Sequence, residues 1–311
     1  MRYLIDNGYI YCKIIPDDAV RDFSEDEMVY YGIVSIAVVM FGFQFFFNDK
    51  FEKNSTSGLR QILKFTLGGN IAGLIVLFAI NKFRFEFTPF SLIVALAGAV
   101  DGILCTFCSI KALGKINLSL YSLFTMLGGM VLPFAAGLIF FDEKLTVGTV
   151  ICFVLCAVSL LFTVEKGSKN SGAVYYIGVF IFNGLSGVIS TVYQRMDYPK
   201  VSETGFSVLK AAVVIVLCAA ALAFNKEKKE KFNRTALIAT GGNGILNCVA
   251  NLLLLFSLAK LPASAQYPMV TGGVMIVSTI IAFFTPNKPK KKEIFAVILS
   301  FIGILALVLL P

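Results

Sequence analysis

The sequence predicts an all-α integral membrane protein with ten transmembrane helices, arranged as two inverted five-helix repeats. Three observations lead to this fold class. Hydrophobic residues make up 57% of the chain and charged residues 15%, with a mean hydropathy of +0.82; long apolar segments recur along the chain; and its two halves resemble each other. Soluble domains average roughly 45–50% apolar and about 25% charged residues. The composition therefore places most of the 311 residues in lipid.

The apolar segments are each about long enough to cross a bilayer. The hydrocarbon core is about 30 Å thick and a helix rises about 1.5 Å per residue, so about 20 apolar residues span it. Helices are favoured because every backbone polar group in lipid needs a partner within the chain. In chain order, the predicted spans are 29–48, 65–81, 90–110, 117–141, 145–164, 173–193, 205–224, 236–257, 262–285 and 294–310.

Charges and turn residues mark the limits of these spans. Only Asp101 and Lys210 place a formal charge inside one. Several of the short connections are rich in Asn, Ser, Gly and Pro, which favour turns, as in 54–58, 167–170 and 286–289.

The two halves match at an offset of about 145 residues. Residues 29–34 (VYYGIV) recur as 174–179 (VYYIGV), and Gly42 aligns with Gly187. An odd number of helices in each copy makes the second copy enter the membrane from the opposite side, which is typical of transporters. We therefore assign a first repeat to 28–165 and a second to 166–311.

Residues 1–27 lie outside the repeat and contain no long apolar run. They are thus predicted to be neither a signal peptide nor a span. Two explanations stay open at this point. The segment is a soluble tail, or its start is mis-assigned and Met28 is the physiological first residue.

The composition also excludes several classes of function. The chain contains no histidine and no tryptophan, so it lacks the commonest general base and zinc ligand. No phosphate-binding Gly-x-x-x-x-Gly-Lys-Ser/Thr motif is present. The cations fall in short clusters between apolar runs, which indicates topology signals rather than a nucleic-acid surface. We expect no enzyme, no metal site, no cofactor and no nucleic-acid partner.

Asp101 is the first candidate functional residue, because it lies near the middle of a predicted span. An ionised aspartate there costs about 2.5–3.5 kcal/mol on insertion scales. It is a candidate proton carrier, or a counter-ion for a cationic substrate. The structural alternative is a carboxyl group packed against Asn243, Asn247 or Asn251 of the eighth span.

Lys210 and Lys64 occupy matching positions in the two repeats. Lys210 lies near one end of its span, so its long stem is expected to extend toward the interface. The alternative is that both lysines point inward and bind an anionic group of the substrate.

The other candidate cavity residues are polar side chains within the spans. Singly, each is expected to hydrogen-bond across helices. Those on the fourth and ninth spans occupy near-equivalent positions, and Pro268 is expected to open the helix backbone beside them. The complete set is Tyr121, Ser122, Thr125, Asn183, Asn243, Asn247, Gln266, Tyr267 and Thr271.

One loop carries a family resemblance. The segment 140–146 (FFDEKLT) closes the fourth span and precedes an apolar fifth. Together with the helix number and the duplication, it resembles the EamA-type branch of the drug/metabolite transporter superfamily over 28–310. Lys64 and Lys210 fit the cation that often opens the second helix there. The second repeat departs from the pattern, with 286–292 (PNKPKKK) in place of the acidic-basic loop.

The resemblance implies secondary transport of small metabolites, amino acids, nucleotide sugars or drugs, often outward. We therefore expect an exporter or exchanger that works by alternating access around a central cavity between the repeats. Its partners would be a small-molecule substrate, the lipid bilayer of a bacterial plasma membrane, and protons or another coupling ion. The protein would be a monomer or a homodimer. The alternatives are a lipid or lipid-carrier flippase of the same fold and, more weakly, a membrane-embedded enzyme.

The even number of spans places both termini on one side of the membrane. The loops on the opposite side carry more Lys and Arg, which favours termini outside. Family relatives are expected to have their termini inside. The side therefore stays open.

Overall fold

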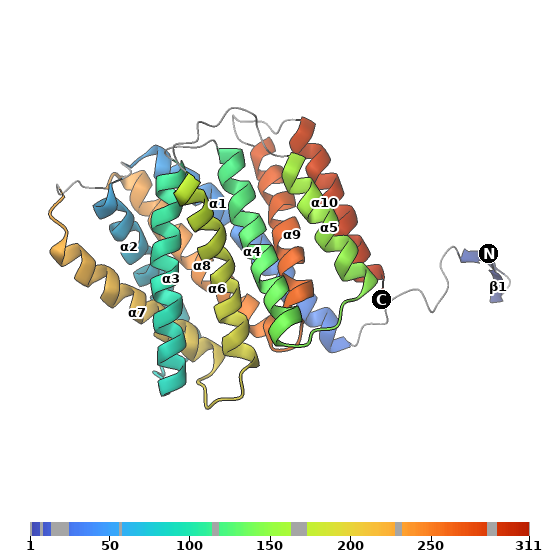
Figure 1. The fold of residues 1–311 in the computed structure, drawn as a ribbon, viewed down its shortest axis with the longest axis horizontal. Coiled ribbons are helices and arrows are strands. Elements are labelled where there is room, and N and C mark those ends of the chain that lie inside the picture. Colours follow the sequence, from blue (N-terminus) through green and yellow to red (C-terminus); the bar gives the residue numbers. More distant parts are fainter. Residues whose placement is uncertain are drawn as a thin grey trace.

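A computed structural model describes residues 2–6, 9–13, 25–55, 58–113, 118–162, 173–227, 232–284 and 291–310. Within these residues the chain forms ten helices that lie side by side (Figure 1). They are α1 (Glu25–Lys53), α2 (Leu59–Ile80), α3 (Pro89–Leu113), α4 (Leu118–Phe140), α5 (Val147–Phe162), α6 (Ala173–Arg195), α7 (Glu203–Phe224), α8 (Arg234–Leu258), α9 (Ala263–Phe283) and α10 (Lys291–Leu309). Each coincides with a predicted segment, so the prediction of ten helices is confirmed.

Several helix boundaries differ from the sequence prediction, and at the starts of α1, α2 and α7 polar residues extend the apolar helix. α2 begins at Leu59, six residues earlier than predicted. α7 begins at Glu203, where the Ser202 hydroxyl accepts a hydrogen bond from the Gly205 amide. α1 begins at Glu25, within the segment assigned to the tail.

The segment that precedes α1 contains an element that the sequence analysis did not predict. Strands β1 (Arg2–Asp6) and β2 (Tyr9–Lys13) pair as an antiparallel hairpin, with Arg2 opposite Lys13.

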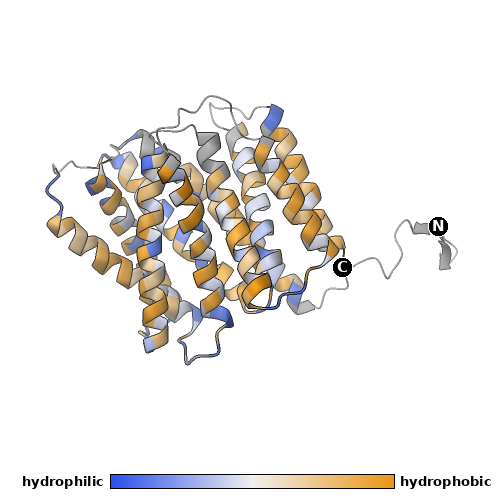
Figure 2. Ribbon diagram, in the orientation of Figure 1, coloured by the Kyte–Doolittle hydropathy of each residue, from blue (hydrophilic) through white to orange (hydrophobic). Residues whose placement is uncertain are grey.

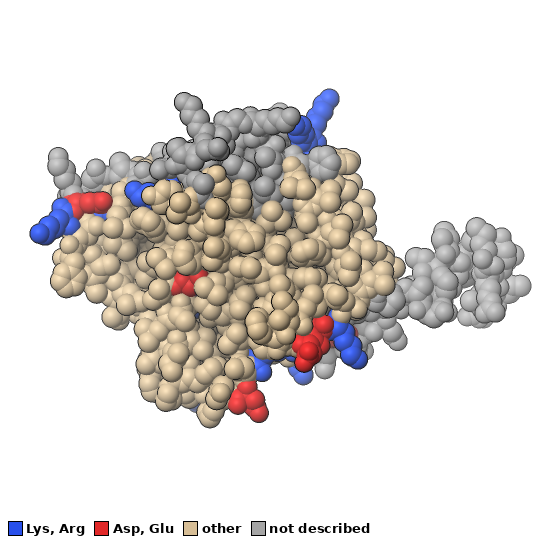
Figure 3. Space-filling view, in the orientation of Figure 1, with Lys and Arg blue, Asp and Glu red and all other residues tan. Residues whose placement is uncertain are grey.

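The surface of the helical body is apolar around its middle. On the face drawn in Figure 3 most charged side chains lie near the two ends of the helices, and one acidic side chain lies nearer the middle; Figure 2 shows mainly apolar helices with polar ends. Large hydrophobic side chains such as Ile75, Ile93 and Val216 are each 66% exposed. Six helices are long and apolar enough to cross a membrane, and the described parts of α4, α5 and α10 form three shorter apolar helices.

Helix contacts recur in matched pairs between the two halves of the chain. α1 packs against α8, and α6 against α3. In the same way α2 packs against α8 and α7 against α3, while α1 packs against α9 and α6 against α4. Three further contacts join equivalent helices directly: α2 with α7, α4 with α9, and α5 with α10.

The α2–α7 contact is closed at both ends by similar hydrogen bonds. At one end, the Thr204 hydroxyl donates to the side-chain oxygen of Asn81 at 2.7 Å. At the other, the Arg60 guanidinium donates to the backbone oxygen of Asn225 at 2.7 Å. Asn81 and Asn225 are the residues at which α2 and α7 end.

Acidic side chains from two loops cap the starts of the same helices. Glu86, before α3, accepts from the Ser202 amide at 2.8 Å. Glu227, before α8, accepts from the Arg60 amide at 2.8 Å. A carboxylate is favourable there because the unpaired amides of a helix N-terminus carry partial positive charge.

α2 and α8 cross closely at two glycines. A Cβ at Gly244 would overlap the backbone of Gly69, and a Cβ at Gly69 would lie 3.3 Å from the Gly244 Cα. Because the obstructing atoms are backbone, no side-chain rotation can relieve the clash. Gly241, one turn earlier on α8, has nothing within 4 Å of its Cβ position.

We expect Gly244→Ala to destabilise the fold by about 1–3 kcal/mol, the usual cost of forcing an extra methyl group into a packed contact. Gly241→Ala is the matched control and should leave stability unchanged or raise it by up to about 1 kcal/mol, because alanine favours helix. Since the chain lacks tryptophan but contains buried cysteines, a thiol-reactive dye can follow melting. Equal melting temperatures for the two variants would contradict the close crossing.

Candidate functional site

Asp101 is a buried acidic residue at the middle of α3. Its side chain is 3% exposed, and neither carboxylate oxygen has a hydrogen-bond partner among the described residues. Unpartnered buried polar groups are rare, because they lose the hydrogen bonds that water would give. The position of this carboxylate is therefore set by the packing of the helices around it and not by hydrogen bonds.

Lys210 of α7 interacts electrostatically with Asp101. Its stem lies against Gly98, one turn before Asp101 on α3: a Cβ at Gly98 would be 3.2 Å from the Lys210 Cε and 3.5 Å from Nζ. Cys248 of α8 also lies within electrostatic range of the ammonium group. The expected extension of Lys210 toward the interface is thus wrong, because the missing side chain at Gly98 leaves room beside the carboxylate.

The structural alternative, in which Asp101 is hydrogen-bonded to asparagines of α8, is not formed among the described residues. The Asn243 amide donates to the Asn48 side-chain oxygen at 2.6 Å and to the Gln44 backbone oxygen at 3.5 Å, both on α1. The Asn251 amide donates to the backbone oxygen of Asn247 within α8. These groups are bonded elsewhere because α8 packs mainly against α1 and α2.

Lys64 does not join Lys210. Its ammonium lies 5.8 Å from the centre of the Phe232 ring, just before α8. The equivalent lysines therefore have different surroundings, one beside an aromatic ring and the other beside a buried carboxylate. An inward-pointing pair of lysines is not formed in this structure.

The candidates on α4, α6 and α9 make contacts between helices. The Asn183 amide donates to the Thr125 backbone oxygen at 2.7 Å, and the Tyr267 hydroxyl donates to the Gly187 backbone oxygen at 2.9 Å. Thr271 is buried. Tyr121 and Ser122 fall within α4, but their side chains lie outside the described residues.

Gln266 is buried on α9 and bonds in a different direction. Its amide donates to the Leu254 backbone oxygen on α8 at 3.0 Å, while its side-chain oxygen has no partner within the described part of the chain. The residues predicted on α9 therefore reach different helices instead of sharing one cavity wall with α4.

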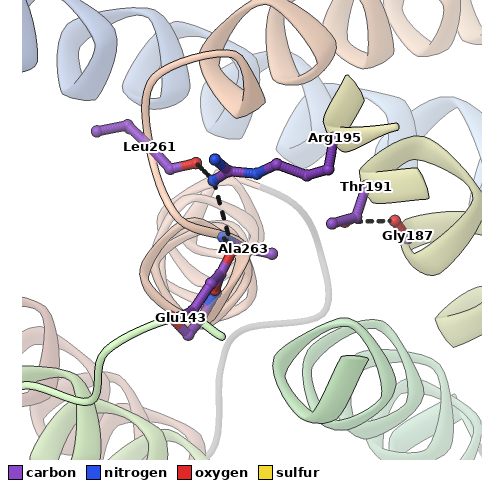
Figure 4. A network of polar contacts seen from close by, with 7 residues as sticks. Glu143, Gly187, Thr191, Arg195, Leu261 and Ala263 are labelled. Atoms are coloured by element: carbon purple, nitrogen blue, oxygen red, sulfur yellow. Dashed lines mark hydrogen bonds and ion pairs between the residues drawn. The ribbon is translucent and has the colours of Figure 1, made fainter. Parts of the chain in front are cut away.

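A second polar centre, which the sequence analysis did not predict, forms around Glu143 (Figure 4). This side chain, 5% exposed, lies in the loop between α4 and α5. Its two oxygens accept from the Ala263 and Ser264 amides, each at 2.8 Å. These are the first residues of α9, so the carboxylate caps the positive end of that helix.

Arg195, in the last turn of α6, also belongs to this centre. Its guanidinium donates to Glu143 at 3.4 Å and to the Leu261 backbone oxygen at 3.1 Å. One acidic side chain thus joins the end of α4, the end of α6 and the start of α9. Glu143 lies within the loop motif 140–146, but nothing in the sequence identified its partners, 52 and 120 positions away.

We expect Glu143→Gln to lower the free energy of unfolding by about 2 kcal/mol, because hydrogen bonds to a charged group contribute roughly 1.5–3 kcal/mol. Asp142→Asn is the matched control: the neighbouring side chain is exposed, and asparagine tolerates the positive φ of 49° there. Thermal melting compares the variants. A loss of stability in Asp142→Asn as large as that in Glu143→Gln would contradict the assigned cap.

Comparison with known proteins gives a fold and no family. No family model matches the chain, and no curated protein does. A crystal structure of another protein is similar over 90% of this chain and 96% of that chain, with a TM-score of 0.68 and 15% sequence identity. The likeness at this identity concerns the fold alone, and it extends over nearly the whole of both chains.

Proposed function

We propose that this protein is a secondary active transporter, an exporter or exchanger of a small metabolite, amino acid or drug. The observation that carries the proposal is the buried Asp101–Lys210 pair. Its members come from α3 and α7, which belong to different halves of the chain. Ionisable residues within apolar helices are costly, and those found there commonly lie on substrate or ion pathways.

The matched contacts support an arrangement of two inverted five-helix repeats. Asn81 and Asn225 end equivalent helices and bond to the start of the partner helix. Glu86 and Glu227 likewise cap equivalent helix starts. Pairs of this kind are expected where two similar units face each other about a two-fold axis, and in transporters such units move against each other around a central site.

In this proposal the ten helices lie in a bacterial plasma membrane. No nucleotide-binding motif is present, so transport draws on a gradient or on exchange. Asp101 is the group through which a proton or another cation would couple to transport. The resemblance to the EamA-type branch of the drug/metabolite superfamily agrees with this mechanism and stays a prediction from the loop motif and the duplication.

The centre around Glu143 would close one end of the pathway. It connects α4 of the first repeat with α6 and α9 of the second. Opening the protein at that end would require these bonds to break. We therefore assign Glu143 and Arg195 to the gate on the side of the termini.

A lipid or lipid-carrier flippase is the second candidate, favoured by one observation. An open apolar groove of about 250 Å³ lies between α3 and α7, lined by Phe85, Leu96, Leu209, Ala212, Val213, Val216 and Leu217. An acyl chain would fit such a lining. A membrane-embedded enzyme remains the weakest alternative, because the chain lacks histidine.

The decisive experiment is solute uptake into vesicles that contain the purified protein, with a panel of amino acids, nucleotides, sugars and cationic drugs. We expect flux of at least one solute, and we expect Asp101→Asn to reduce it at least tenfold because the buried charge is lost. The matched control is Asp197→Asn, an exposed carboxylate in the loop before α7.

Transfer of fluorescent phospholipids between leaflets is measured in the same vesicles. Lipid transfer without solute flux would replace the transporter proposal by the flippase. Solute flux that is equal in Asp101→Asn and in the control would contradict the role given to the buried pair.

A further inference from the structure

Asp101 and Lys210 interact electrostatically, but no hydrogen bond joins them. Neither carboxylate oxygen has a hydrogen-bond partner among the residues that the structure describes, which include Lys210. An aspartate and a lysine that served only to neutralise each other would be expected to form a hydrogen-bonded ion pair. The hydrogen-bonding capacity of this carboxylate instead remains unused inside the helix bundle.

We infer that Asp101 and Lys210 together bind one zwitterionic solute, whose ammonium group donates to Asp101 and whose carboxylate or phosphate group accepts from Lys210. This inference rests on the proposed transport function and specifies its substrate class. Such a ligand would supply an opposite charge to Asp101 and to Lys210 at the same time.

Other classes of solute fit the pair less well. A simple cation would be attracted by Asp101 but repelled by Lys210. A simple anion would be attracted by Lys210 but repelled by Asp101. An uncharged solute would supply no opposite charge to either residue. In a low-dielectric interior an unpaired charge is strongly disfavoured, so the pair selects against all three.

The surroundings allow a small group to approach the pair. Gly98 and Gly102 flank Asp101 on α3, and nothing lies within 4 Å of the Cβ position at Gly102. Around them the helix faces are apolar: Val94, Ala95 and Ala99 of α3 are buried, as is Val214 of α7. We expect the charged ends of the solute to lie at the pair and its side group to lie in the space beside Gly102.

Two sources can supply the same pair of charges. A free α-amino acid carries an ammonium and a carboxylate, and the headgroup of phosphatidylethanolamine carries an ammonium and a phosphate. The probes are therefore the L-amino acids other than cysteine, and glycerophosphoethanolamine as the soluble headgroup. Binding to the full-length protein is measured by thermal shift with a thiol-reactive dye, because a ligand that binds only the folded state raises its melting temperature.

The wild-type protein tests the charge requirement without any variant. For the amino acid that binds best, the analogues are its carboxamide, which lacks the anionic group, and its des-amino acid, which lacks the ammonium group. For glycerophosphoethanolamine, the analogues are ethanolamine, which keeps only the ammonium group, and glycerol 3-phosphate, which keeps only the phosphate group. We expect each single-charge analogue to bind at least tenfold more weakly than the zwitterion.

Variants then assign each charge to a residue. In Asp101→Asn, removal of the ligand's ammonium should change affinity less than twofold, because its partner is already absent. In Lys210→Met, removal of the ligand's anionic group should likewise change affinity less than twofold, because Lys210 is the partner of that group. Such non-additivity identifies the two interacting pairs. Asp197→Asn is the control and should keep the full discrimination of the wild type.

Three results would overturn the inference. The first is that no zwitterion stabilises the wild-type protein. The second is that an analogue with a single charge binds as tightly as its zwitterion. The third is that, in both variants, removing the ligand's charge weakens binding as much as it does in the wild type. If solute flux is observed together with any of them, the transporter proposal stands and the zwitterion site fails. Absence of both solute flux and lipid transfer would instead remove the proposed function itself.

Discussion

The structure depends on one constraint, which is that helices with apolar outer faces must satisfy their polar groups inside the bundle. Thr204 and Arg60 donate to oxygens of asparagines at helix ends, and Tyr267 donates to the Gly187 backbone oxygen within α6. Glu86, Glu227 and Glu143 each accept from the backbone amides at the start of a helix from the other half. An unpaired amide at a helix start loses a bond that the helix itself cannot supply, so these side chains complete the helix ends. They consequently fix which helices are neighbours.

Within that framework, the Asp101–Lys210 pair is the exception that points to function. Its carboxylate is as deeply buried as the core side chains, and neither of its two oxygens has a hydrogen-bond partner among the described residues. Close packing at the glycine crossing of α2 and α8 holds the adjacent helices at short range. An apolar groove lies between α3 and α7, the two helices that carry the pair.

The helices were predictable because each is specified by its own residues. Long uncharged runs determine where they lie, and the prediction failed only at boundaries such as Leu59 and Glu25, where polar residues continue an apolar helix. The hairpin β1–β2 was not predicted, since two five-residue strands leave a weak local pattern. The individual site residues were less predictable. Asp101 was recognisable by its charge alone, whereas Arg195 was not singled out.

The sequence by itself determined the number of helices, their order and the two charges that lie within them, because hydropathy and chain length are local properties. Only the tertiary structure decided which polar groups meet. It placed the Lys210 side chain beside Gly98 rather than toward a helix end. It also directed the Asn243 amide to a hydrogen bond with Asn48 of α1. It also brought Glu143 to the start of α9. These choices depend on the rotation and neighbours of each helix, which are set by packing between segments more than a hundred residues apart.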